Sequence, residues 1–170
     1  MNIAIIGGGP AGLMAAEVAL AGGAQVALYD SMPSVGRKFL LAGKGGLNLT
    51  HSDPSDLFLS RYGERRAQVA PWLAEFGPDA LRTWARGLGI DTYVGSSGRV
   101  FPTDMKAAPL LRAWLRRLRQ DGLTIYVRHR WCGWDEKKAL RFETPQGAAA
   151  VRADAVILAL GGGSWPQLGS

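Results

Sequence analysis

The first thirty residues alternate between apolar runs and short turns. Residues 3–6 form a β-branched apolar run of the kind found in buried parallel strands, and residues 10–21 have the composition of a helix that Gly22-Gly23 ends. Residues 25–29 predict a second strand. The succession of strand, turn, helix, turn and strand predicts an α/β fold with a central parallel sheet and helices around it.

The middle of the chain has a helical pattern. Residues 53–89 show helical spacing after an Asp53-Pro54 pair that resembles a cap and first turn, and residues 91–102 predict two short strands around a Ser-Ser-Gly turn. A basic amphipathic helix is expected from about residue 105 to residue 120. We therefore expect a mostly helical insertion at about 53–104.

The last third of the chain returns to strand-like runs separated by turns. Residues 123–127 and 155–160 predict further parallel strands, and the second of these ends in a run of glycines. Three runs between them predict a three-stranded antiparallel meander, over 130–135, 139–144 and 148–152. Residues 31–51 show little helical or strand periodicity, so we expect a basic, glycine-rich loop there.

The turn after the first strand contains the fingerprint G-x-G-x-x-G, at Gly7, Gly9 and Gly12. The first glycine turns the chain, the second lets a pyrophosphate approach the backbone, and the third lets the helix pack against the strand. Pro10 fits the first helical turn, where the amide has no helical partner and the positive end of the dipole favours phosphate. Asp30 lies about twenty residues further on, where a carboxylate accepts hydrogen bonds from a ribose and disfavours a 2′-phosphate. These features predict a Rossmann-like domain of the FAD/NAD(P)-binding class, with a site for FAD or NAD and not for NADP.

Composition narrows the class of protein. The chain has 170 residues, of which 47% are hydrophobic and 20% charged, as in one compact globular domain. Its single cysteine, Cys132, excludes an internal disulfide and favours a reducing, cytoplasmic setting, and no spacing of ligands predicts a metal site. No run reaches the roughly 18 apolar residues of a membrane span, so we expect no membrane partner.

The net charge of +6 raises a second function class. Arg112, Arg116 and Arg119 lie on one side of the predicted helix and could contact nucleic acid. A solvated helix face is the favoured interpretation, because apolar residues share the opposite face, and we expect no nucleic acid partner. A nucleic-acid-binding module that uses this helix stays an alternative function.

The segment after Asp30 helps to choose between the dinucleotides. A simple NAD dehydrogenase domain would continue soon into another strand and helix, whereas a long basic loop suits an extended cofactor such as FAD. An NAD-binding dehydrogenase domain stays a second alternative, although no catalytic set of His, Lys and Tyr stands out. We assign no catalytic residue, because in flavin enzymes the isoalloxazine ring itself carries the hydride.

Four stretches carry a resemblance to a known family: "IIGGGPAGLMAA" at 5–16, "GRKFLLAGKGGLNLTH" at 36–51, "GRVFPTDMKAAPLLRAW" at 98–114 and "ADAVILALGGGSWPQLGS" at 153–170. With these, the sequence resembles flavoproteins with two dinucleotide-binding domains. Within that group it is similar to the bacterial FAD-binding family of aminoacetone oxidase-like and dehydro-bile-acid reductase-like proteins. The resemblance runs from end to end of the chain.

The resemblance implies an FAD-dependent oxidoreductase with a non-covalent flavin. It assigns the pyrophosphate to Gly7, Gly9, Ala11 and Gly12, the adenosine ribose to Asp30, and the phosphates or ribose to Arg37 and Lys38. It places Lys44, Asn48, Leu49 and Thr50 along the cofactor, with the last three near the ribityl chain or flavin ring, Trp131 near the adenine, and the backbone of Gly161 and Gly162 close to the dinucleotide. Many members have glutamate at the position of Asp30.

The resemblance also implies a longer protein. We expect residues 1–170 to form the FAD-binding domain of such a protein, with a C-terminal substrate domain that this chain lacks. The remainder of the longer chain would complete the flavin site. The expected substrate is a small molecule, and NAD(P)H is a candidate electron donor.

Overall fold

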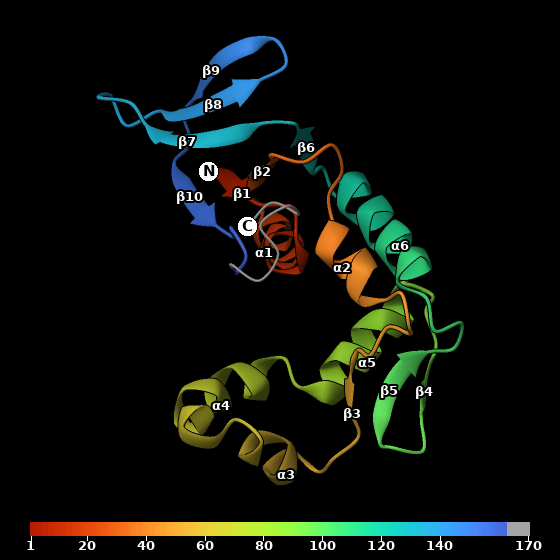
Figure 1. Cartoon of the computed structure of the whole chain (residues 1–170). Helices are drawn as coiled ribbons and strands as arrows, with labels where there is room; N and C mark the ends of the chain where they lie inside the picture. Colours follow the sequence, from red (N-terminus) through yellow and green to blue (C-terminus); the bar gives the residue numbers. More distant parts are fainter. Residues whose placement is uncertain (163–170) are drawn as a thin grey trace. The chain divides into compact units, whose positions relative to one another are not determined.

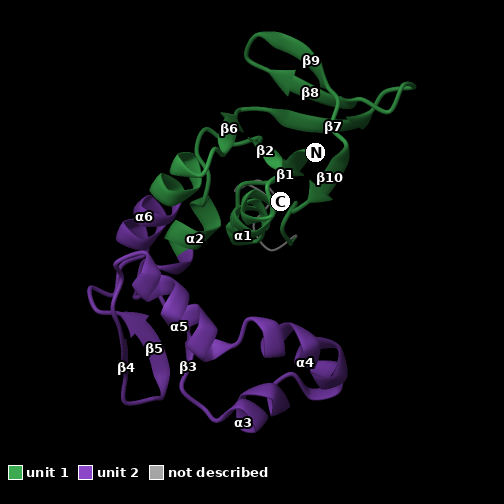
Figure 2. Ribbon diagram, turned by 180° about the vertical axis from the view of Figure 1, so that it is seen from behind, with its two compact units in different colours: residues 1–41, 115–170 green, residues 42–114 purple. Residues whose placement is uncertain are grey.

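The computed structural model describes residues 1–162, so the end of the fourth family motif, 163–170, lies outside the described residues. The chain divides into two compact units (Figure 2). Unit 1 contains residues 1–41 and the chain from residue 115 onward, and unit 2 contains residues 42–114. None of the helices within residues 1–162 has the length and apolar character needed to cross a membrane.

Unit 1 is built on a four-stranded parallel sheet (Figure 1). Its strands, in the order β10-β1-β2-β6, are β10 (Ala155–Leu158), β1 (Asn2–Ile6), β2 (Gln25–Asp30) and β6 (Thr124–Val127). The fingerprint turn leads into α1 (Pro10–Ala21), which has the bounds predicted from the sequence. This arrangement confirms the predicted Rossmann-like α/β fold with a parallel sheet.

Both faces of the sheet are covered, which explains why β1 is apolar and buried from Ile3 to Ile6. Ala4 and Ile6 belong to a buried cluster with Leu140 and Phe142 of the meander. Because successive side chains of a strand point to opposite faces, Ile5, which is fully buried, points to the other side, where α1 contacts β1 and β2.

The predicted meander is present as an antiparallel sheet of β7 (Arg130–Trp134), β8 (Leu140–Thr144) and β9 (Gly147–Val151). Phe142 of β8 is 1% exposed and stacks on Tyr29 of β2 with a distance of 4.5 Å between ring centroids. This aromatic contact joins the meander to the parallel sheet.

Four helical segments and a small antiparallel sheet lie wholly within unit 2. The helical segments are α3 (Ser55–Ser60), the 3-10 helix η1 (Gly63–Arg65), α4 (Arg66–Glu75) and α5 (Pro78–Gly87). The sheet has the order β3-β5-β4, from β3 (Thr50–His51), β5 (Arg99–Pro102) and β4 (Thr92–Val94). The predicted helices and hairpin are therefore confirmed, within a compact unit that begins and ends about ten residues outside the predicted insertion.

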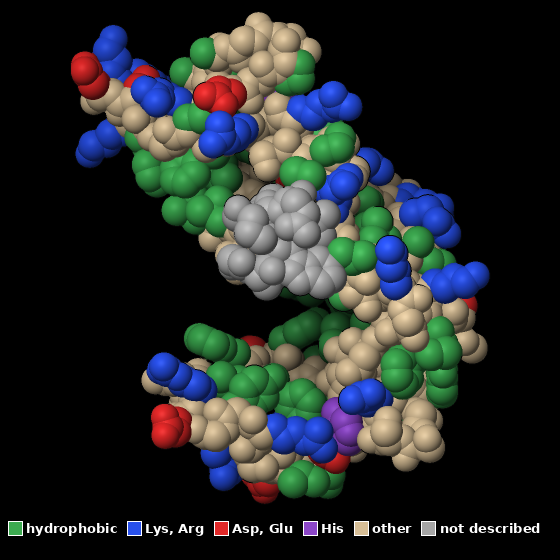
Figure 3. Space-filling model, in the orientation of Figure 1, with side chains coloured by type: hydrophobic (Ala, Val, Ile, Leu, Met, Phe, Trp, Pro, Cys, Tyr) green, Lys and Arg blue, Asp and Glu red, His purple; other side chains and the backbone are tan. Residues whose placement is uncertain are grey.

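Helix α6 (Ala107–Gln120) begins in unit 2 and ends in unit 1. Leu111, Trp114 and Leu118 are buried on one face of α6. The arginines at 112, 116 and 119 are exposed, and basic side chains lie over this helix in Figure 3. The amphipathic pattern thus places the arginines in solvent, as expected from the sequence.

Several local predictions were wrong. The segment 31–51 is not a continuous loop, because it contains the short helix α2 (Arg37–Ala42) and β3. Helix α6 begins at Ala107, two residues after the predicted start at about residue 105. Met105 has a φ of 58°, which is incompatible with a right-handed helix at that residue. Asp53 does not cap α3: Pro54 is the N-cap residue, with no side-chain hydrogen bond, and the Asp53 carboxylate pairs with Arg61 and His51.

Candidate functional site

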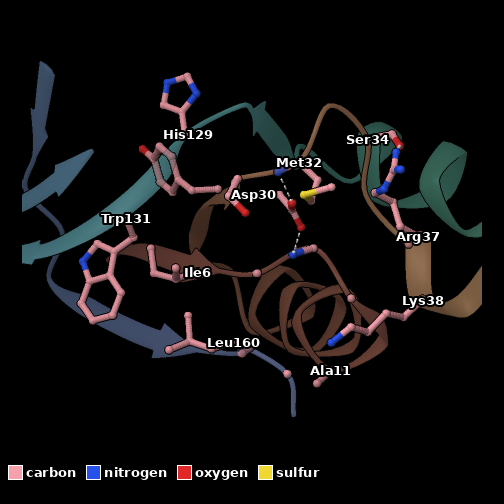
Figure 4. Close-up of a pocket in the computed structure, with 18 of the residues that line it drawn as sticks. Ile6, Ala11, Asp30, Met32, Ser34, Arg37, Lys38, His129, Trp131 and Leu160 are labelled. Atoms are coloured by element: carbon pink, nitrogen blue, oxygen red, sulfur yellow. Dashed lines mark hydrogen bonds between the residues drawn. The ribbon is translucent and has the colours of Figure 1, made fainter. Parts of the chain in front are cut away.

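A pocket of about 360 Å³ lies in unit 1 at the carboxyl ends of β1, β2 and β10 (Figure 4). Its walls come from the fingerprint turn with the start of α1, the end of β2 with the following loop and α2, the start of β7, and the chain after β10. Open α/β sheets bind ligands at this edge, outside the carboxyl ends of their strands.

The three fingerprint glycines have different surroundings. A Cβ on Gly7, which has a φ of 110°, would lie 2.2 Å from the carbonyl oxygen of Ala159, and a Cβ on Gly12 would lie 1.9 Å from the carbonyl oxygen of Gly7. A Cβ on Gly9 would meet no protein atom within 4 Å. Gly7 and Gly12 are therefore required for close packing of the turn, whereas Gly9 leaves free space beside the start of α1.

The start of α1 gives the pocket the part that suits an anion. Gly9, Pro10 and Ala11 line it, and Gly9 is the N-cap residue of the helix with no side-chain cap. The first amides of a helix have no partner within the helix, and its dipole places partial positive charge there. Gly12 does not line the pocket, because it faces the turn instead.

Two basic side chains at the start of α2 line the same pocket. The ammonium group of Lys38 donates a hydrogen bond to the carbonyl oxygen of Gly162 at 3.1 Å. The Arg37 guanidinium donates to the hydroxyl oxygen of Ser34 at 3.5 Å, while its Nε is buried and has no hydrogen-bond partner among the described residues. A buried N–H donor without an acceptor is costly, so Arg37 suits an anionic ligand.

The opposite end of the pocket is apolar. Trp131, Ile6 and Leu160 lie there, away from the basic residues, as Figure 4 shows. The Trp131 ring meets Trp134 edge-on at 4.7 Å, and its buried Nε1 has no partner within the described part of the chain. An apolar aromatic end and a cationic end match the two halves of an adenosine phosphate.

Asp30 also lines the pocket, but both of its carboxylate oxygens accept hydrogen bonds from the backbone. Oδ2 accepts from the amide of Gly8 at 2.6 Å, and Oδ1 accepts from the amide of Met32 at 2.8 Å (Figure 4). Its predicted role as the ribose ligand stays a prediction.

The remaining predicted residues divide between the units. Gly161 lines the pocket, and Gly162 contacts it through Lys38. The other four belong to unit 2 and do not line this pocket: Lys44, Asn48, Leu49 and Thr50. Leu49 donates its amide to the carbonyl oxygen of Val100 at 2.8 Å, beside the β3-β5 pairing. Contact of these four residues with a flavin stays a prediction.

The residues of the pocket that the sequence interpretation missed include Gly8, His129 and Arg130. The run of three glycines at 7–9 could have indicated Gly8, because only two of them belong to the fingerprint. His129 precedes the predicted meander strand and Arg130 is its first residue, and neither belongs to a motif. Among residues 1–162, no three His, Cys, Asp or Glu side chains gather as a metal site would require.

The chain matches a known protein family over its whole length. The family model of the HI0933-like protein Rossmann domain matches residues 1–170. The 3-dehydro-bile acid delta(4,6)-reductase of Clostridium scindens is 32% identical over 173 residues, which cover 99% of this chain and 41% of the reductase. The chain thus spans about two-fifths of the length of this curated relative, and the predicted resemblance to dehydro-bile-acid reductase-like proteins is confirmed.

Solved structures share the fold. The 3-ketosteroid-delta4-(5alpha)-dehydrogenase of Rhodococcus jostii RHA1 is 16% identical with a TM-score of 0.69, covering 94% of this chain and 45% of the dehydrogenase. A flavocytochrome c3 fumarate reductase in an open conformation is 19% identical with a TM-score of 0.69, covering 95% of this chain and 33% of the reductase. At these identities the likeness concerns the fold.

Proposed function

Because the chain belongs to the HI0933-like Rossmann-domain family, we propose that it is the FAD-binding part of a flavin-dependent oxidoreductase. The observation that carries the proposal is the free space at Gly9, beside the start of α1, in a pocket that Arg37 and Lys38 also line. A dinucleotide pyrophosphate needs this combination of close backbone approach, helix amides and cationic side chains. The relatives named as a reductase and a dehydrogenase support the oxidoreductase class.

The residues of the pocket fit the adenosine diphosphate half of FAD. The amides at the start of α1 and the side chains of Arg37 and Lys38 would bind the pyrophosphate, and the buried Nε of Arg37 would gain an acceptor. Trp131 would pack against the adenine. In the proposed complex, Lys44 and Asn48 contact the cofactor further along its length.

A bound flavin would supply the chemistry, because its ring accepts and returns a hydride. The part of the protein described here binds and orients the cofactor. This chain matches 41% of the length of the reductase relative. We propose that the unmatched remainder of the reductase corresponds to a substrate-binding part, and that such a part determines which small molecule is the substrate. NAD(P)H is the proposed electron donor, in keeping with the reductase relative.

The purified protein tests this function directly. We expect flavin absorbance bands in the visible spectrum, release of FAD on denaturation, and recovery of the bands when FAD is added back to the apoprotein. Titration of the apoprotein with FAD, NAD⁺ and ADP by calorimetry separates the candidates. Binding of FAD and ADP supports the proposal, whereas binding of NAD⁺ with no affinity for FAD would identify an NAD-dependent domain instead.

A further inference from the structure

The two tryptophans of β7 lie on the same face of the meander because of a bulge in that strand. Trp131 pairs with Phe142 and Trp134 pairs with Leu140, so three steps along β7 match two steps along β8. Residues three apart in a regular strand point to opposite faces, and one extra residue restores the same face. Gly133, inside the bulge, has a φ of 91°, which favours glycine. Both tryptophans therefore share the face of Phe142 and Leu140, which belong to the buried cluster.

The Trp131 side chain has packing partners in two places. It packs against the buried cluster that contains Ile6 and Phe142, and its ring meets the Trp134 ring edge-on, with 4.7 Å between the ring centroids and 85° between the ring planes. Trp131 lines the pocket, whereas Trp134 does not line it and is 47% exposed. Trp134 thus contacts a residue of the pocket wall from outside the pocket.

The orientation of the Trp131 ring depends on packing. Its Nε1 atom is buried without a hydrogen-bond partner among residues 1–162, and in Figure 4 this atom lies on the side of the ring away from Ile6. A buried N–H without an acceptor is costly, which favours a turn of the ring that brings the N–H to water. The edge-on contact with Trp134 opposes such a turn, so the indole keeps its present place in the pocket wall.

We propose that Trp134 is a positioning residue for the adenine end of the pocket, because it fixes the ring of Trp131 against which the base packs. The inference rests on the proposed function, since it concerns how the same pocket binds the adenosine half of FAD. Trp134 acts on the ligand only through Trp131, so its effect is confined to ligands that carry a base. The pyrophosphate is assigned to the other end of the pocket, beside Arg37 and Lys38, and does not depend on either tryptophan.

The experiment measures the affinity of the whole chain for ADP and for inorganic pyrophosphate, which has no base, by calorimetry. Trp134→Ala should weaken ADP binding by about threefold to tenfold, the equivalent of one edge-on aromatic pair, and leave pyrophosphate binding within about twofold of the wild type. Trp134→Phe should restore ADP binding to within about twofold, because a ring returns beside Trp131. In a Trp131→Ala background, Trp134→Ala should have no further effect on ADP binding. Trp72→Ala is the matched control, because Trp72 is an exposed tryptophan of α4 that does not line the pocket.

The outcomes are distinct. Wild-type affinity for ADP in Trp134→Ala would overturn the inference while the proposed function stands. Equal losses for ADP and pyrophosphate would also overturn it, because they would show a general disturbance of unit 1, and so would a further loss of ADP affinity in the Trp131→Ala background. If the wild type binds neither ADP nor FAD, the proposed function fails together with the inference. Trp134→Leu, which keeps an apolar side chain without a ring, replaces Trp134→Ala if that variant does not fold.

Discussion

The ammonium group of Lys38 donates a hydrogen bond to the carbonyl oxygen of Gly162, at 3.1 Å, and so joins the start of α2 to the chain that follows β10. These two segments form different walls of the pocket in unit 1. The bond is exposed, so it contributes little to folding. In the proposed complex, Lys38 would act on the anionic ligand in two ways: it would supply a positive charge, and its hydrogen bond would link two walls of the pocket.

Replacement of Lys38 by methionine tests these effects. We expect the affinity for ADP and FAD to fall by about tenfold, because a charge-assisted contact is lost. The melting temperature should change by no more than about 2 °C, as for other exposed substitutions. Calorimetric titrations at low and high salt measure the effect, which should shrink as salt screens the charge. Lys137→Met, in the exposed turn between β7 and β8, removes the same charge outside the pocket. An equal loss in both variants would contradict a local role for Lys38.

Gly9 and Gly12 should respond in opposite ways to alanine. In Gly12→Ala the new methyl group would lie 1.9 Å from the carbonyl oxygen of Gly7, which outweighs the helix propensity that alanine gains. We expect a cost of about 3 kcal/mol in the free energy of unfolding, which lowers the melting temperature by roughly 6–12 °C. In Gly9→Ala the methyl group meets no protein atom within 4 Å and the φ of −80° suits alanine.

Gly9→Ala should therefore fold normally and bind nucleotide poorly. Its methyl group would occupy the space through which a pyrophosphate approaches the backbone, so we expect more than about a tenfold loss of ADP affinity. Thermal unfolding and calorimetry on the same two variants separate packing from binding. Wild-type affinity for ADP in Gly9→Ala would remove the main support for the dinucleotide pocket.

The elements around the fingerprint, β1, α1 and β2, could be predicted from the sequence because residues close together in the chain determine them. Glycine spacing, Pro10 in the first helical turn and Gly22-Gly23 after the last one set the bounds of α1, and apolar runs set β1 and β2. The meander was also predictable, since turn residues separate its three strands.

The features that the sequence did not predict depend on contacts between residues that are distant in the sequence. Helix α2 has six residues, too few to show a helical period, and none of them is buried. Met105 takes a left-handed φ that no propensity predicts, so the start of α6 was placed too early. The partners of Asp30, at Gly8 and Met32, follow from where the turn packs, and the motif alone gives only the presence of the acid.

Phe142 should be more important for stability than Tyr126, although both rings stack on Tyr29. The centroid distances are 4.5 Å for Phe142 and 5.0 Å for Tyr126, but Phe142 is 1% exposed and Tyr126 is 41% exposed. We expect Phe142→Ala to cost about 3–5 kcal/mol, because it leaves a cavity between the meander and the parallel sheet. Tyr126→Ala should cost about 1 kcal/mol. Urea unfolding followed by circular dichroism measures both values, and equal costs would contradict a role for the burial of Phe142 in stability.

Ionisation of the Tyr29 phenol should lower the free energy of unfolding at high pH. Burial raises the pKa of its phenol above the ordinary value of 10.0, and the nearby Tyr126 adds to the shift when it is ionised. Because the folded state holds this proton more tightly than the unfolded state, the contribution of Tyr29 to stability is complete below pH of about 10 and is lost as pH rises through the folded pKa. The slope from this one group is at most about 1.4 kcal/mol per pH unit.

Tyr29→Phe isolates this contribution, since phenylalanine keeps the stacked ring and removes the proton. We expect the free energy of unfolding of the wild type to fall more steeply than that of Tyr29→Phe between about pH 9 and pH 11, with parallel curves at lower pH. Lysines and the other tyrosines titrate in both proteins, so the difference between the two curves belongs to Tyr29. Urea titrations at half-unit steps of pH provide the curves. Curves that stay parallel up to pH 11 would show that the Tyr29 phenol ionises as readily in the folded protein as in the unfolded chain, and would place it in contact with water.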